Sequence, residues 1–128
     1  MEGDPIRLLL VDDETAFVDV LFNRFRRRGL QVTKAYSGTE AIRILRDQDF
    51  DVSILDLKME DMDGIEVLKI FKKMLPSMAV IMLTGHGSER AARAGIEEGA
   101  YDYLTKPCGF EELLAKIEKA VSRERRST

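Results

Sequence analysis

The sequence contains one cysteine, one histidine and no apolar run long enough to cross a membrane. With Cys108 as the only cysteine, no internal disulfide can form, which is typical of proteins from a reducing compartment. A membrane-spanning helix needs about 20 consecutive apolar residues. The amino terminus, MEGDPIRLLLVDDE, places acid before a short apolar run and has no small-residue cleavage site. We therefore expect a cytoplasmic protein that has neither a signal peptide nor a membrane segment.

The chain has 128 residues and a net charge of -3. This length fits one domain, because most domains contain roughly 100 to 150 residues. The negative net charge gives no general attraction for nucleic acid, so we expect no direct nucleic-acid binding. The basic cluster at residues 24–28 is followed by Gly29, which favours the cationic last turn of a helix with a glycine stop.

Short apolar runs alternate with amphipathic stretches along the whole chain. Five runs have the length of strands, at residues 6–11, 30–36, 51–57, 78–84 and 100–105. Each is followed by residues at helical spacing or by a small-residue segment. The helix predicted at 37–47 begins with Ser37 and Glu40 in capping-box spacing, and the last predicted helix covers 110–121. Five strand–helix units therefore fill the chain.

The apolar runs are nearly continuous rather than alternating, which indicates strands that are buried on both faces. Such strands form parallel sheets with helices on each side, and their crossovers are right-handed. Ligands of these folds bind outside the carboxyl ends of the strands. The sequence thus predicts a doubly wound α/β fold with a site at that edge of the sheet.

Acidic side chains follow two of the predicted strands: Asp12, Asp13, Glu14 and Asp56. Carboxylates that converge repel one another unless a cation or protons lie between them. Magnesium is commonly held by one or two carboxylates with waters and a phosphate oxygen, whereas zinc prefers histidine or thiolate ligands. The chain offers only His86 and Cys108 for zinc. This edge therefore favours a hard divalent cation.

Two further strands end in Thr84 and in Thr105, Lys106 and Pro107. The compact charge of Lys106 suits phosphate oxygens, and the Thr84 hydroxyl is a donor that can follow a phosphoryl group. Together with the acids, these residues indicate phosphoryl transfer. Taken singly, each residue has a simpler interpretation. The acids at 12–14 can cap a helix, Thr84 can be a strand former, and Lys106 can be a solvated surface charge.

Four segments, LLVDDE, SILDLKMEDMDG, MLTGHGS and GAYDYLTKP, resemble the receiver domain of two-component response regulators. The match covers nearly the whole chain. It implies a (βα)5 flavodoxin-like three-layer sandwich whose five-stranded parallel sheet has the order 2-1-3-4-5, as in a chemotaxis member of this family. It also implies a receiver domain at residues 1–122 and a basic tail, or the start of a linker, at 123–128.

By this resemblance Asp56 is the phosphoacceptor. The phosphoryl group would come from a phosphohistidine on a sensor histidine kinase or phosphotransfer protein, or from a small-molecule donor. Asp13 and Asp56 would bind Mg²⁺, or Mn²⁺ in its place, through their carboxylates. The backbone carbonyl of Lys58 would bind it too, and Asp12 mainly through water. The domain would assist its own phosphorylation and dephosphorylation without being a turnover enzyme.

The resemblance further implies a switch. The phosphoryl group, which Lys106 contacts, would draw the Thr84 hydroxyl inward, and the Tyr103 ring would rotate into the vacated space. The face built from the fourth helix, fifth strand and fifth helix would then change. It would act on an output domain or partner protein, or form a phosphorylation-dependent homodimer. The Lys106–Pro107 bond is cis in the family, although only about 5–6% of X–Pro bonds in folded proteins are cis.

Four further positions carry expectations of their own. The family often has proline where Glu60 stands, so we expect the loop to be less rigid and more acidic. Lys58 and His86 occupy positions that influence hydrolysis, and neither is suited to orienting water, which predicts a slowly hydrolysed aspartyl phosphate. The alternative is that both side chains point into solvent. We expect Cys108 to pack as a small hydrophobe, the alternative being a reactive thiol beside Lys106.

Functions of other classes fit the sequence less well than a phosphorylated receiver domain does. A receiver-shaped interaction module that is never phosphorylated would have no need of the whole set of site residues. A nucleotide-binding enzyme is disfavoured because the first strand is followed by neither G-x-x-x-x-G-K-[ST] nor G-x-G-x-x-G. A phosphatase of the haloacid-dehalogenase type would want a second aspartate where Lys58 stands. The segments TGHGS and YDYLTKPC also resemble receivers of transcriptional activators with ATPase modules. Kinase specificity would lie around Ala16, Asp19 and Val20.

Overall fold

The structure is a computed structural model that describes residues 3–85 and 89–127. Within these residues strands and helices alternate: β1 (Arg7–Val11), α1 (Thr15–Arg27), β2 (Gln31–Ala35), α2 (Gly38–Asp47), β3 (Val52–Asp56), α3 (Gly64–Met74), β4 (Ala79–Thr84), α4 (Glu89–Glu97), β5 (Asp102–Thr105) and α5 (Phe110–Ser127). None of these described helices has the length and apolar character of a membrane span.

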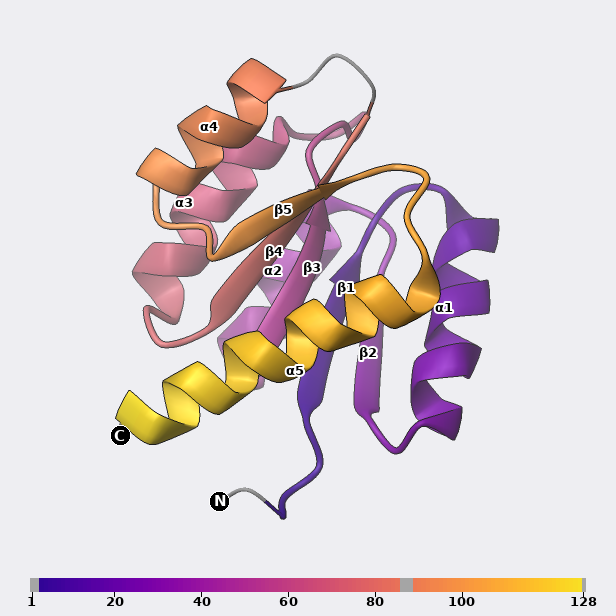
Figure 1. The fold of residues 1–128 in the computed structure, drawn as a ribbon. Helices are drawn as coiled ribbons and strands as arrows, with labels where there is room; N and C mark the ends of the chain where they lie inside the picture. The colour runs from indigo at the N-terminus through magenta and orange to yellow at the C-terminus, as the bar shows by residue number, and fades with distance from the viewer. Residues whose placement is uncertain (1–2, 86–88, 128) are drawn as a thin grey trace.

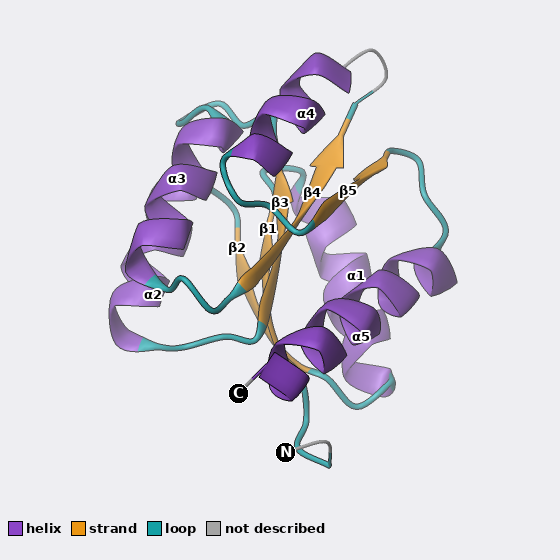
Figure 2. Ribbon diagram, turned by 60° about the vertical axis from the view of Figure 1, so that its left-hand side comes forward, coloured by secondary structure: helices purple, strands orange, loops and turns teal. Residues whose placement is uncertain are grey.

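The strands form one parallel sheet in the order β2-β1-β3-β4-β5. Helices α1 and α5 cover one face, and α2, α3 and α4 cover the other (Figures 1 and 2). This arrangement confirms the predicted doubly wound three-layer fold and its strand order. Because all strands run the same way, their carboxyl ends meet at one edge, at the top of Figure 1.

The sheet separates two apolar cores, and successive residues of a strand contribute to opposite ones. In β1, Leu8 and Leu10 pack with α1 and α5, whereas Leu9 and Val11 pack with α2 and α3. The central strands β3 and β4 are buried along their whole length, while β2 and β5 at the sheet edges are partly exposed. Burial on both faces is the reason that the central strands are continuously apolar.

The predicted helix boundaries at α1 and α2 agree with the structure. The Ser37 hydroxyl accepts a hydrogen bond from the Glu40 N–H at 3.1 Å, and the Glu40 carboxylate accepts one from the Tyr36 N–H at 2.6 Å. Helix α1 ends at Arg27, and Gly29 has φ of 92°, in the left-handed region where glycine is favoured.

Helix α5 is longer than the predicted 110–121 and continues to Ser127. Most of the segment expected to be a tail or linker is therefore helical. A guanidinium nitrogen of Arg125 lies 3.6 Å from a carboxylate oxygen of Asp51, which also accepts a hydrogen bond from the Arg7 N–H. These contacts attach the last turns of α5 to the edge of the sheet opposite the strand carboxyl ends.

Candidate functional site

Three aspartates gather where β1 and β3 end. Asp12 and Asp13 follow β1 directly and Asp56 is the last residue of β3, its neighbour in the sheet. One carboxylate oxygen from each lies within 4.8 Å of the other two. We call these three residues the acidic cluster. The structure thus brings together the carboxylates that the sequence placed at separate strand ends.

Two members of the acidic cluster are almost fully buried. Asp12 is 1% exposed and Asp56 is 6% exposed. The pKa of Asp56 is raised from 3.8 to about 6, first by burial and next by the charge of Asp12, whereas the Lys58 N–H and the Lys106 ammonium act in the opposite direction. The site therefore holds negative charge at a cost in free energy.

Lys106, just past the end of β5, supplies the positive charge of the site. Its ammonium nitrogen lies 2.8 Å from oxygens of both Asp12 and Glu14, and 3.8 Å from an oxygen of Asp56. Burial alone lowers the pKa of Lys106, but the hydrogen bonds to Asp12 and Glu14 raise it above its usual value. Sequence reasoning named Glu14 as a strand-end acid or cap but did not find its bond to Lys106.

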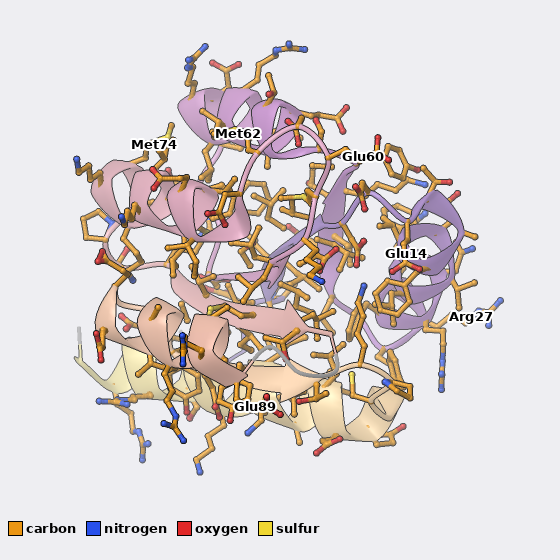
Figure 3. All side chains as sticks on the ribbon, turned by 90° about the horizontal axis from the view of Figure 1, so that it is seen from above. Glu14, Arg27, Glu60, Met62, Met74 and Glu89 are labelled. Atoms are coloured by element: carbon orange, nitrogen blue, oxygen red, sulfur yellow. The ribbon has the colours of Figure 1, made fainter. Side chains whose placement is uncertain are left out.

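The loop that follows Asp56 closes over the acidic cluster. The Lys58 N–H donates to Asp56 Oδ1 at 3.2 Å, and the Glu60 N–H donates to Asp13 Oδ2 at 3.0 Å. Seen from above the strand ends, Glu60 lies on the side of this loop towards α1 (Figure 3). Two of the three aspartates are thus held by backbone N–H groups of one loop.

Asp61, in the same loop, was not singled out from the sequence. Its carboxylate accepts hydrogen bonds from the N–H groups of Gly38 and Thr39 and from the Thr39 hydroxyl, at 3.1, 2.9 and 2.8 Å. Burial alone raises the pKa of Asp61, but these donors lower it below its usual value. The acid-rich loop alone gave no signal of this contact, because the partner helix begins more than 20 residues earlier.

The predicted switch residues lie on β4, the neighbour of β3 in the sheet, and on β5, the strand after it. Thr84, at the end of β4, is 2% exposed, and its hydroxyl donates to the Leu104 carbonyl at 3.4 Å. Tyr103 on β5 is partly buried and packs against the core beneath α2 and α3. The Lys106–Pro107 bond is cis, and the Lys106 N–H donates to the Thr84 carbonyl at 2.8 Å. Thr84 and Tyr103 thus come from two adjacent strands, and Lys106 follows the second of them.

The other singled-out residues are less closely tied to the site. Cys108 is partly buried against the core beneath α1 and α5, and burial raises the pKa of its thiol, as suits a packed hydrophobe. The Lys58 side chain is exposed. His86 lies outside the described residues, so the prediction of slow hydrolysis stays a prediction.

The donor set of the acidic cluster fits a hard divalent cation. Three carboxylate oxygens converge, two of the residues are buried, and burial together with the charge of Asp12 raises the pKa of Asp56. Magnesium and manganese prefer such oxygen ligands, whereas no histidine or thiolate lies in the cluster among the described residues.

Comparison with known proteins identifies the family to which the fold belongs. The family model described as response regulator receiver domain matches residues 8–118. The chain is similar to the transcriptional regulatory protein GlrR of Escherichia coli K12, at 37% identity over 128 residues that cover 100% of this chain and 29% of that protein. It is also similar to ZraR of the same organism, at 38% identity over 122 residues that cover 95% of this chain and 28% of that protein.

Among solved structures, the chain resembles a response regulator receiver domain protein (CheY-like) from Methanospirillum hungatei JF-1. The TM-score is 0.94 at 30% identity, and the match covers 98% of this chain and 100% of that one. By contrast, the chain spans less than a third of the length of the two curated relatives.

Proposed function

Because the chain belongs to the response regulator receiver domain family, whose members are phosphorylation-dependent signalling switches, we propose that Asp56 is its phosphoacceptor. One observation carries the proposal. An Asp56 carboxylate oxygen lies within 4.8 Å of an oxygen of each of the other two aspartates, and the ammonium group of Lys106 lies 3.8 Å from Asp56. The stability of the fold does not require three carboxylates and an ammonium group at one buried edge of the sheet, whereas phosphoryl transfer uses all four groups.

In the proposed reaction an Asp56 carboxylate oxygen attacks the phosphorus of the donor. The new P–O bond replaces the P–N bond of a phosphohistidine, or the P–O bond of a small acyl phosphate, and the donor leaves with the bonding electron pair. The attacking form is the carboxylate, which predominates above the pKa of about 6. The sensor histidine kinase, phosphotransfer protein or small molecule therefore supplies the group, and the domain supplies the acceptor.

The residues that would hold Mg²⁺, or Mn²⁺ in its place, are the acidic cluster and the backbone carbonyl of Lys58. When bound, the cation offsets the negative charge shared by the carboxylates and the incoming phosphate. Lys106 would move from Glu14 and Asp12 to the phosphoryl oxygens, which attract an ammonium group more strongly than a singly charged carboxylate does.

The proposed switch then uses the hydroxyl of Thr84. That hydroxyl leaves the long 3.4 Å bond to the Leu104 carbonyl and donates to a phosphoryl oxygen. The Tyr103 ring follows into the space, and the face formed by α4, β5 and α5 changes. This face would act on an output domain, on a partner protein or on a second copy of the chain.

The test is incubation with Mg²⁺ and acetyl phosphate, followed by mass spectrometry of the intact protein. We expect the mass of one phosphoryl group to be added to the wild type, and no addition to Asp56→Asn or after chelation of the metal. Asp63→Asn, a charge-matched change in the same loop, should be phosphorylated like the wild type. A wild type that gains no mass would refute the proposal and favour the interaction module that is never phosphorylated.

A further inference from the structure

We propose that the backbone N–H of Glu60 is a positioning group for Asp13. It holds the Asp13 carboxylate in the orientation in which one of its oxygens joins the acidic cluster. This inference rests on the proposed metal site. The role belongs to the backbone of Glu60 and not to its carboxylate. The Glu60 side chain itself is exposed.

The hydrogen bond is well formed for this purpose. The donor and acceptor are 3.0 Å apart, and the acceptor is an ionised oxygen, which makes such a bond stronger than one between neutral groups. A carboxylate on a short side chain can rotate about its last bond, and a fixed donor removes much of that freedom. Outer hydrogen-bond partners of this kind orient metal ligands and affect the affinity for the metal.

The donor can be fixed only if the loop that carries it is fixed, and the loop is attached at several points. The Gly64 N–H donates to the Leu57 carbonyl at 3.1 Å, and Lys58 forms an antiparallel bridge with Asp63. A Cβ at Gly64 would collide with the Leu57 backbone, so the loop closes tightly there. These contacts hold the base of the loop.

The tip of the loop is attached to α2. Asp61, the residue after Glu60, accepts three hydrogen bonds from Gly38 and Thr39. Met62 is partly buried against the core beneath α2 and α3, and lies on that side in Figure 3. The Glu60 N–H is therefore presented from a segment that is anchored on both sides, towards α2 through Asp61 and towards β1 through Asp13.

A proline at position 60 could not fill this role, because proline has no backbone N–H. The pair Glu60→Pro and Glu60→Ala isolates the bond, since both variants lose the carboxylate and only the first loses the N–H. The readout is Mg²⁺ affinity measured by isothermal titration calorimetry on the unphosphorylated protein. We expect Glu60→Pro to bind Mg²⁺ about tenfold more weakly than Glu60→Ala, as is typical when an outer partner of a metal ligand is lost.

Equal affinities in two folded variants would overturn the inference. Folding is checked by circular dichroism and by urea unfolding without metal. A wild type that binds no Mg²⁺ would instead count against the proposed metal site, which keeps the two failures distinct.

A second measurement decides the matter if Glu60→Pro does not fold. Amide hydrogen exchange, followed by NMR in metal-free protein, should show a protected Glu60 N–H whose exchange quickens at least about tenfold in Asp13→Ala. The Gly64 N–H, which bonds to the Leu57 carbonyl, is the internal control and should not change. A Glu60 amide that is unprotected, or that is indifferent to Asp13→Ala, would contradict the proposed role.

Discussion

Replacing Asp56 by asparagine should stabilise the metal-free protein at neutral pH. Burial, and next the charge of Asp12, raise the pKa of Asp56 from 3.8 to about 6. An acid whose pKa is higher in the folded state binds its proton more tightly there than in the unfolded chain. Above about pH 6 the Asp56 carboxylate is ionised in the folded protein, and burying this charge beside Asp12 lowers the free energy of unfolding. Asparagine keeps the shape of the side chain and carries no charge.

The size of the effect follows from the two pKa values. At about pH 7.5 the carboxyl group is ionised in both states, so proton binding adds nothing to stability. At about pH 4.5 it is protonated in the folded state and still mostly ionised in the unfolded chain, which adds about 2 kcal/mol to the free energy of unfolding. This stability is complete below the unfolded pKa of 3.8 and is lost as the pH rises through about 6.

The variant lacks this group, so its advantage over the wild type should be about 2 kcal/mol larger at pH 7.5 than at pH 4.5. The assay is urea unfolding of both proteins at both pH values with a chelator present. Titrating groups remote from Asp56 cancel in the comparison because the two proteins share them. An advantage that is independent of pH, or that grows towards low pH, would refute the assignment of a raised pKa to Asp56.

Two further predictions concern stability. The Ser53 hydroxyl is buried in β3 and, within the part of the chain that the structure describes, has no hydrogen-bond partner. Ser53→Ala should therefore raise the free energy of unfolding, measured by urea unfolding, by up to about 1 kcal/mol, and a lowered free energy would contradict this account. Asp61→Ala removes the acceptor for the donors at the start of α2 and should lower the free energy of unfolding by about 1–2 kcal/mol. An unchanged urea midpoint would show that the contact adds nothing.

Much of the fold follows from local patterns in the sequence. The apolar runs predicted β3 and β4 because strands covered on both faces have no polar side to alternate with. The pair Ser37 and Glu40 predicted the start of α2, since the capping bonds span only a few residues. The strand order, by contrast, came from the family resemblance. Right-handed crossovers restrict the possible orders without selecting one of them.

The sequence predicted which residues form the site, but it predicted few of the hydrogen bonds and ion pairs between them. Asp12, Asp13 and Asp56 were expected to converge because neighbouring parallel strands end at the same edge. The bond between Lys106 and Glu14 was not expected, since it joins residues 92 positions apart and depends on how two loops approach one another. The same holds for Asp61, whose partners lie on a helix that precedes it.

Helix α5 extends beyond the predicted 110–121 for a related reason. Hydrophobic spacing fades after 121, so periodicity gives no sign of further helix there. The structure continues the helix to Ser127, where Arg125 contacts Asp51 across the base of the sheet. A long-range ion pair thus accompanies a helical segment that local spacing did not predict.

The course of α5 also bears on how the protein can be handled. With 18 residues the helix spans about 27 Å. It runs across its face of the sheet towards the edge opposite the strand carboxyl ends, where the Arg125 guanidinium donates to the Asp4 carbonyl at 3.2 Å (Figure 1). A fluorescent reporter or surface-attachment tag joined after it would therefore lie far from the acidic cluster. Protein that is attached to a surface through the end of α5 should therefore keep its acidic cluster facing the solution.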